Sequence, residues 1–157
     1  MMNDQPLAHA DDMLRLDRQI CFPLYAASNL LSRLYRPVLA QFNLTYPQYL
    51  VMLVLWEKES CTVGELGHHL FLDSGTLTPL LKRLTAQGLV NRARDPHDER
   101  RVLITLTEQG NALRQQAVIV PHTLAQSLNL NPEQVEQLRQ QAQHIAAIMS
   151  HAIEQPS

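Results

Sequence analysis

Cysteine 21 is the residue of this chain best placed for covalent chemistry. Pro23 follows it closely, and proline suits the first turn of a helix because its missing N–H costs nothing there. We therefore expect a helix from about Pro23 to Gln41, with Cys21 at its N-terminus; a helix that runs through from Asp12 is the alternative. Exposed amides at a helix N-terminus favour the thiolate, which is the nucleophilic form of cysteine.

A second group of chemically useful residues is basic. The whole chain has a formal net charge of -2, yet six of its 13 Lys and Arg residues fall between positions 82 and 101. DNA binding needs a basic face and not a basic protein. The alternative is a solvated surface of mixed charge, because acidic residues lie in the same window. The six basic residues are Lys82, Arg83, Arg92, Arg94, Arg100 and Arg101.

Residues 62–106 contain the elements that would position this basic face. A short helix is expected after Thr62, with Glu65 at the capping-box spacing. A second helix is expected to start at Asp73 or Ser74, since both are good N-caps, and a glycine follows its end. Two helices joined by a turn of about three or four residues are typical of a helix-turn-helix.

Two strands are expected directly after this unit, over residues 89–94 and 102–106, with a polar tip at 95–101. A helix-turn-helix followed by a hairpin with a basic tip indicates a winged helix. Its second helix would enter the major groove of DNA. The wing would lie along the backbone or in the minor groove.

The rest of the chain is expected to be helical. A core helix should run from Tyr46 to Lys58, and residues 59–61 should link it to the winged unit. A helix over 107–127, interrupted at Pro121, and a last helix over 132–154 should follow. The last helix carries an apolar stripe with no later element to cover it, which indicates a partner subunit; packing within the same chain is the alternative.

The predicted organisation is one domain over residues 1–157, mainly α with a small β-hairpin wing. The winged helix-turn-helix lobe occupies 62–106, and dimerisation helices occupy 11–45 and 107–157. Residues 1–10 are expected to form a loose tail. Residues 11–20 are expected to form a short helix or an ordered arm.

Composition favours a globular protein of the cytoplasm. A hydrophobic content of 45% can build a core, and no apolar run approaches the roughly 18 residues that span a membrane. The acidic, polar N-terminal segment differs from a signal peptide. Two cysteines are too few for a disulfide scaffold, so we expect the reducing cytosol. His68 and His69 are adjacent rather than at metal-ligand spacing, so no metal or cofactor is expected.

Local motifs give the chain a family resemblance. The order of elements, Asp98-x-Arg100 at the wing tip and Leu106-Thr107-x-x-Gly110 after it resemble the MarR family of winged-helix repressors. Within that family the chain is similar to the organic hydroperoxide sensors, the OhrR type, from about residue 14 to about residue 125. The segments that carry this narrower match are Leu16 to Ala26, Tyr35 to Pro37, Leu44 to Leu50, Leu72 to Arg83 and Asp98 to Arg100.

This resemblance implies a homodimeric repressor that senses organic hydroperoxides through Cys21. In such sensors the thiolate becomes a sulfenic acid, and the protein then releases its operator, an inverted repeat in double-stranded DNA. Tyr35 and Tyr46 resemble the phenols that the family places against the reactive sulfur across the dimer interface, and Tyr25 resembles a third. An apolar lining would come from Phe22, Leu24, Phe42 and Trp56.

The family pattern also implies which residues contact DNA. On the recognition helix, threonines would touch base edges or phosphates, and basic residues would contact phosphates, which position the protein without specifying sequence. Arg100 would reach into the minor groove, with Asp98 orienting it. The recognition-helix residues are Ser74, Thr76, Thr78, Lys82 and Arg83.

The chain departs from some relatives in what happens to the oxidised sulfur. Those relatives carry a second cysteine after the long fifth helix, and it closes an intersubunit disulfide; residues 121–130 contain none. We therefore expect the one-cysteine route, in which a small cellular thiol traps Cys21 as a mixed disulfide or the sulfur is overoxidised. Cys61 as the resolving partner is the alternative.

Two other functions compete with this interpretation. One is a MarR-type repressor released by a small aromatic ligand in the dimer cleft, with Cys21 incidental. The other is a thiol peroxidase, but no arginine lies close to Cys21 on its C-terminal side to activate the peroxide, and a DNA-binding unit would be idle. We therefore predict that the protein is not an enzyme.

Overall fold

A computed structural model gives the fold and describes residues 12–155. The loose tail predicted over residues 1–10 lies outside this range. The chain forms two compact units, Met1–Val120 and Pro121–Ser157. Within residues 12–155, we find no helix with the length and apolar character that crossing a membrane requires.

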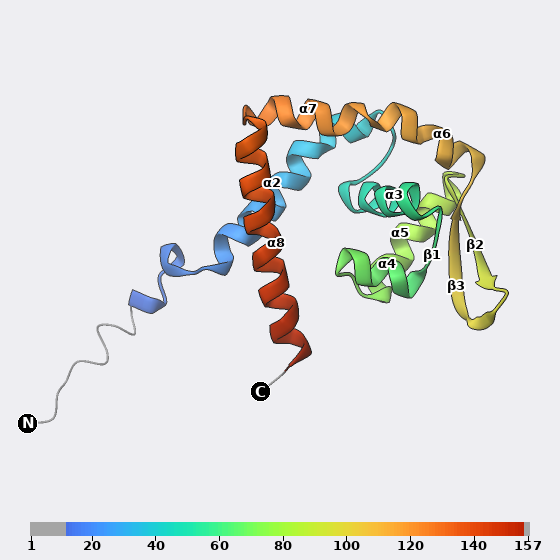
Figure 1. The fold of residues 1–157 in the computed structure, drawn as a ribbon, viewed down its shortest axis with the longest axis horizontal. Coiled ribbons are helices and arrows are strands. Elements are labelled where there is room, and N and C mark those ends of the chain that lie inside the picture. Colours follow the sequence, from blue (N-terminus) through green and yellow to red (C-terminus); the bar gives the residue numbers. More distant parts are fainter. Residues whose placement is uncertain (1–11, 156–157) are drawn as a thin grey trace, which may run out of the picture. The chain divides into compact units, whose positions relative to one another are not determined.

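The first unit combines helices with a small sheet (Figure 1). The segment predicted as a short helix or ordered arm contains one turn of 3-10 helix. The elements in order are η1 (Leu16–Arg18), α2 (Cys21–Ala40), α3 (Tyr46–Lys58), β1 (Ser60–Thr62), α4 (Val63–Leu70), α5 (Ser74–Ala86), β2 (Val90–Asp95), β3 (Asp98–Leu106) and α6 (Glu108–Ala117).

Three antiparallel strands form the sheet, in the order β1-β3-β2. Ser60 pairs with Thr105 and Thr62 with Leu103. The linker predicted over residues 59–61 is therefore wrong at Ser60 and Cys61, which belong to β1. A strand of three residues is too short to show alternation, and it forms because it satisfies the backbone groups along the edge of β3.

The wing hairpin is longer than predicted, because β3 begins at Asp98 instead of Val102. Asp95 pairs with Asp98, so the turn contains only Pro96 and His97. The Asp95 carboxylate accepts a hydrogen bond from the His97 backbone N–H at 2.9 Å. The register shifts between Arg94 and Asp95, because Arg94 pairs with Val102, so residues 99–101 of β3 have no partner in β2. A charged run with such an irregularity shows no alternation from which a strand could be predicted.

Side-chain caps start the two helices of the helix-turn-helix. Thr62 Oγ1 accepts from the Glu65 N–H at 3.2 Å, and Glu65 Oε2 accepts from the Thr62 N–H at 2.7 Å. The Asp73 carboxylate accepts from the Thr76 N–H at 2.7 Å and starts α5. These local bonds confirm the predicted caps and hence the predicted helix-turn-helix.

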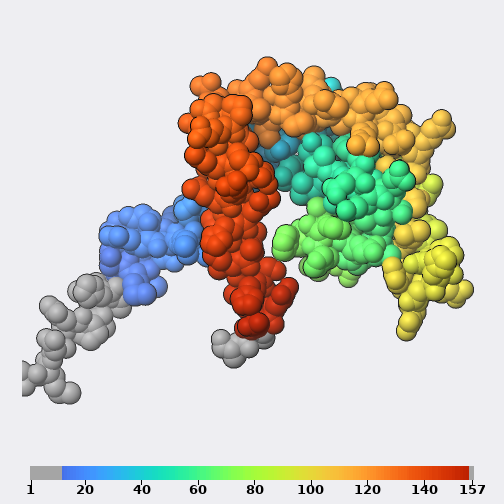
Figure 2. All heavy atoms as spheres, in the orientation of Figure 1, coloured from blue at the N-terminus to red at the C-terminus, as the bar shows by residue number. Residues whose placement is uncertain are grey.

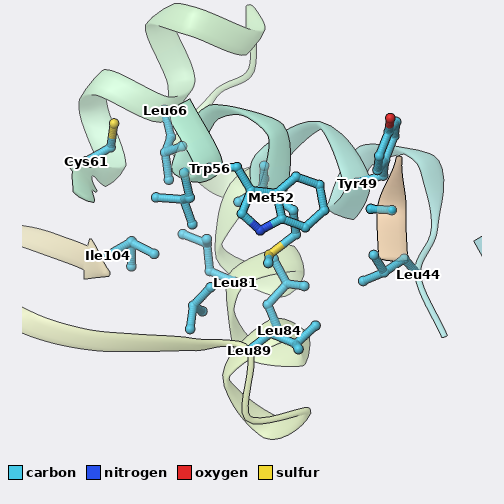
Figure 3. Close-up of a cluster of buried hydrophobic side chains, with 14 of the residues drawn as sticks. Leu44, Tyr49, Met52, Trp56, Cys61, Leu66, Leu81, Leu84, Leu89 and Ile104 are labelled. Carbon is cyan, nitrogen blue, oxygen red and sulfur yellow. The ribbon is translucent and has the colours of Figure 1, made fainter. Parts of the chain in front are cut away.

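The hydrophobic core of this unit collects side chains from α3, α4, α5 and the sheet (Figure 3). Leu77, Leu81 and Leu84 of α5 are fully buried, so they are packing residues. Burying such leucines contributes on the order of 2 kcal/mol each. Other buried members are Met52, Leu55, Trp56, Leu66, Val90 and Ile104.

The junction between the wing and α6 explains the Leu106-Thr107-x-x-Gly110 motif. Thr107 Oγ1 donates to the Gly88 carbonyl at 2.6 Å and accepts from the Gly110 N–H at 2.9 Å. A Cβ on Gly110 would clash with the Leu89 carbonyl oxygen, so only glycine fits this close approach. The motif therefore holds the base of the wing against the first turn of α6.

The long helix predicted over residues 107–127 is two helices, α6 and α7 (Ile119–Leu128). The break lies at Val118 and not at Pro121. Proline lacks the N–H that would bond to the carbonyl of Ala117, and its ring clashes with that carbonyl. The helix is therefore interrupted about one turn before the proline itself.

The second unit contains most of α7 and the whole of α8 (Pro132–Glu154), whose bounds match the prediction. Asn131 and Gln134 form a capping box at its start. None of the residues of α8 is buried in the described chain, and its apolar stripe is accessible. The accessible large apolar residues are Val135, Leu138, Ile148, Met149 and Ile153.

Candidate functional site

Cys21 is exposed and is the first residue of α2. The helix begins two residues earlier than the predicted start at Pro23, and the placement of Cys21 at a helix N-terminus is confirmed. Ile20 at the N-cap provides no side-chain hydrogen bond to the first turn. No capping side chain therefore engages the backbone amides of this turn.

An open hollow of about 430 Å³ lies beside the start of α2, and its wall is mostly apolar. Leu16 and Phe22 supply the apolar surface, and Arg15 and Asp17 form an ion pair with 3.0 Å between Nη2 and Oδ2. Phe22 directly follows Cys21 in the chain, while Cys21 itself is not part of the wall. A wall of this kind suits an alkyl or aryl group better than a small polar molecule.

Tyr35 of α2 and Tyr46 of α3 pack against each other, with ring centroids 4.4 Å apart. Burial raises the pKa of Tyr46, and burial together with the neighbouring phenols raises the pKa of Tyr35 to about 12. Both groups are therefore protonated at neutral pH and can donate hydrogen bonds to an anion. We call Tyr35 and Tyr46 the phenol pair.

Tyr49 joins the phenol pair and was missing from the residues that the sequence pointed to. Its ring centroid lies 6.0 Å from that of Tyr35 and 6.4 Å from that of Tyr46. Burial raises the pKa of Tyr49 as well, and the neighbouring Tyr46 adds to this effect. The three-residue spacing from Tyr46, which places both on one face of a helix, was the available signal.

Cys21 and the phenol pair do not meet within one chain. Tyr35 follows Cys21 by 14 positions on the same helix. At about 1.5 Å per residue, these positions are roughly 21 Å apart along the axis. Tyr25 is one turn from Cys21, and its side chain is 68% exposed. The predicted thiol-contacting residues are thus divided: Tyr25 lies near Cys21 on α2, whereas Tyr35 of α2 and Tyr46 of α3 lie far from it.

Cys61, the second cysteine, is buried in β1 and pairs with Ile104 of β3. Burial raises the pKa of its thiol, and the nearby Glu65 carboxylate adds to this effect. A protonated and enclosed thiol is a poor nucleophile. Cys21 is therefore accessible to a reactant, whereas Cys61 is enclosed.

The recognition helix α5 presents a polar face opposite its buried leucines. Thr78 is half-buried, and its hydroxyl donates to the Ser74 carbonyl at 2.7 Å, which leaves its oxygen only as an acceptor. The other predicted contact residues on this helix are accessible to a ligand. They are Ser74, Thr76, Lys82 and Arg83.

The wing presents one guanidinium held by a carboxylate. Arg100 Nε lies 3.1 Å from Asp98 Oδ1, and the Arg100 backbone N–H donates to the same oxygen at 3.1 Å. The pair holds the pKa of Asp98 below its ordinary value. The Arg100 side chain is 91% exposed, and Figure 2 shows the hairpin, in yellow, reaching the surface. Asp98 therefore limits the directions in which Arg100 can point.

A second wing ion pair was not predicted from the sequence. Arg101 Nε lies 3.5 Å from Asp95 Oδ2, and the Asp95 side chain is only 9% exposed. Asp95 also accepts a hydrogen bond from the His97 N–H. The same carboxylate therefore stabilises the turn and holds the Arg101 guanidinium in place. Its pairing with Arg101 depends on the two-residue turn, which the predicted seven-residue tip did not contain.

The chain resembles known transcriptional regulators over most of its length. Residues 33–117 match the family described as transcriptional regulator SarA/Rot. The organic hydroperoxide resistance transcriptional regulator of Bacillus subtilis is 50% identical over 129 residues, which cover 82% of this chain and 86% of that protein. These matches span the helix-turn-helix, the wing and the phenol pair.

Solved structures show the same fold. The reduced form of AbfR from Staphylococcus epidermidis, bound to DNA, superposes with a TM-score of 0.74 at 39% identity, covering 92% of this chain and 99% of that one. Wild-type MarR of E. coli superposes with a TM-score of 0.66 at 29% identity, covering 81% and 96%.

The fold, the accessible polar face of α5 and the basic wing define a DNA-binding transcriptional regulator of the winged-helix class, and not an enzyme. The chain belongs to the MarR family, and within it to the type of the organic hydroperoxide regulators.

Proposed function

We propose that this regulator is a repressor that releases its operator when an organic hydroperoxide oxidises Cys21. The observation that carries the proposal is that Cys21 is exposed in the first turn of α2. The Ile20 side chain at the N-cap makes no hydrogen bond to the amides of this turn. The name of the Bacillus subtilis relative supports the class of oxidant. The apolar hollow that Leu16 and Phe22 line supports an organic group on the peroxide.

The chemistry takes place at the sulfur of Cys21. The thiolate attacks the terminal peroxide oxygen, so an S–O bond forms while the O–O bond breaks, and the alkoxide takes a proton and leaves as an alcohol. The sulfur loses two electrons and the peroxide gains them. A small cellular thiol then displaces water from the sulfenic acid and forms a mixed disulfide. The burial of Cys61 supports this one-cysteine route.

A homodimer completes the site in this proposal. Because Tyr35 lies roughly 21 Å from Cys21 of its own chain, the phenols that hold the sulfur would come from the other subunit. The partner's Tyr35 and the partner's Tyr46 would donate hydrogen bonds to the thiolate. Accessible apolar residues on both units support a buried subunit interface. In the first unit these are Met13, Leu14, Leu16, Ile20 and Leu30.

The recognition helix and the wing contact different grooves of the DNA. In our proposal α5 enters the major groove, where Ser74 and Thr76 reach bases or phosphates and Lys82 and Arg83 neutralise phosphates. Arg100 enters the minor groove at each end of an inverted repeat. An adduct on Cys21 would displace the phenols and change the distance between the two recognition helices.

Binding to the DNA upstream of its own gene tests the proposal, before and after addition of cumene hydroperoxide and cysteine. Wild type should release the DNA, and Cys21→Ser should retain it. Cys61→Ser is the matched control and should respond like wild type, with intact mass spectrometry reporting one cysteine adduct. Release by Cys21→Ser would make Cys21 incidental and favour a repressor that answers to a small ligand.

A further inference from the structure

A row of aromatic rings leads from the phenol pair into the core. The centroid of Tyr49 lies 6.0 to 6.4 Å from the two phenol rings, and 6.4 Å from that of Trp56 in an edge-on arrangement at 66°. These separations lie within the range of direct aromatic contact. A displacement of the phenol pair therefore reaches Tyr49 before any other ring of this row.

Trp56 ends the row with one directional contact. Its indole has a single N–H donor, which bonds to the Gly110 carbonyl at 2.9 Å inside the core. Figure 3 shows Trp56 in the middle of the buried cluster and Tyr49 at one side, with its phenol oxygen turned away from the cluster. Tyr49 and Trp56 are only 5% and 7% exposed, so both have little free space in which to move.

Gly110 connects this contact to the wing. Its N–H donates to Thr107 Oγ1, and its Cα approaches the Leu89 carbonyl too closely for any side chain. Leu89 directly precedes β2, and its carbonyl also accepts from the Thr107 N–H at 3.1 Å. A shift of Trp56 would therefore move the base of both wing strands.

We propose that Tyr49 and Trp56 are positioning residues that couple the phenol pair to the wing; this coupling rests on the hydroperoxide-sensing function proposed above. An adduct on Cys21 displaces the phenols, the displaced phenols press on Tyr49, and Trp56 shifts its bond to Gly110. Close-packed interiors move between discrete arrangements and do not deform smoothly, so a small displacement reaches the wing as a change of its angle.

The alternative is that these rings only fill the core. In that case a substitution would change stability and DNA affinity in both redox states alike. Coupling instead changes the ratio of the oxidised to the reduced dissociation constant, which a loss of stability alone does not affect. The ratio is therefore the quantity to measure.

The experiment uses the full-length protein and a duplex that the reduced wild type selects from a random-sequence pool. Cumene hydroperoxide with cysteine provides the oxidised state, and mass spectrometry verifies the adduct on Cys21. We expect wild type to bind about 5- to 150-fold more weakly after oxidation, which is the usual range of such couplings. Tyr49→Leu should bring this ratio close to one, and Tyr49→Phe, which keeps the ring, should restore it.

Two further variants separate the coupling from simple packing. Trp56→Phe keeps a ring but lacks the donor to Gly110, so its ratio should also fall. Met52→Leu, at a fully buried neighbour on α3, is the matched control and should keep the wild-type ratio. Trp56 is the only tryptophan in the chain, so the tryptophan fluorescence comes from this side chain alone. The emission should change on oxidation in wild type and stay constant in Tyr49→Leu and Cys21→Ser.

The outcomes are distinguishable. If wild type retains DNA after Cys21 is oxidised, the hydroperoxide-sensing function is wrong, and the coupling is wrong with it. If wild type releases DNA and both Tyr49→Leu and Trp56→Phe release it to the same extent, the coupling alone is wrong. If Tyr49→Leu does not fold, the ratio of dissociation constants for Trp56→Phe and the change in wild-type fluorescence on oxidation test the coupling instead.

Discussion

The winged helix-turn-helix and α8 are both helical regions with well-formed caps, but only the first region buries its apolar residues. In α5 the leucines at positions 77, 81 and 84 are fully enclosed, whereas in α8 Leu138 and Ile148 remain more than half exposed. The capping box of Asn131 and the ion pair of Glu136 with Arg139 give α8 local stability. Local bonds of this kind fix a helix but do not cover its apolar side. The difference indicates that the first region folds on its own contacts, whereas the apolar side of α8 is left uncovered within its own unit.

A charge on the apolar stripe of α8 should have the largest effect. Leu138→Glu would place an unpaired carboxylate in the proposed subunit interface, at a cost to dimer formation of about 3 to 5 kcal/mol. Sedimentation equilibrium should show a monomer at concentrations where wild type is a dimer. Gln143→Glu, on the opposite side of the helix, is the matched control and should leave the association unchanged. Equal association of Leu138→Glu and wild type would contradict the proposed interface.

A methyl group at the base of the wing should have an intermediate effect. Gly110→Ala forces a Cβ against the Leu89 carbonyl, and such overpacking costs about 1 to 3 kcal/mol. Urea unfolding should show the loss at a fixed dimer concentration. Gly64→Ala, whose Cβ would meet only a distant Thr62 oxygen, provides the comparison and should be close to neutral. A neutral Gly110→Ala would mean that the wing base can move away from α6 without cost.

The cap of the recognition helix should give the smallest effect, and it depends on pH. The Thr76 N–H lowers the pKa of Asp73, so the cap stabilises the fold above the ordinary aspartate pKa of about 3.9 and is lost as pH falls through the folded-state value. Asp73→Asn keeps a capping oxygen at every pH. Thermal unfolding between pH 3 and 7 should therefore show the difference between wild type and Asp73→Asn changing only at the acidic end. A difference that is constant with pH would exclude the carboxylate as its source.

Local signals in the sequence were sufficient for the caps and for the position of Cys21. Thr62 with Glu65, Asp73, and Asn131 each act within three residues, so the sequence alone could predict them. Long-range pairing could not be predicted in this way. β1 forms because its backbone groups pair with those of β3. Asp95 pairs with Arg101 only when the two-residue turn has formed. Within the site, the sequence pointed to the phenol pair but not to Tyr49, whose role depends on ring contacts between α2 and α3.

The irregular segment of the wing also limits how this sequence can diverge in evolution. The register shifts between Arg94, which pairs with Val102, and Asp95, which pairs with Asp98, so residues 99–101 of β3 have no partner in β2. Such a bulge already interrupts the alternation of side chains between the two faces of a strand, so the bonds of Arg100 to Asp98, and not the pleat, set its direction. Lineages descended from this chain should therefore tolerate a change in the number of unpaired residues more readily than a change in the spacing between Asp98 and Arg100.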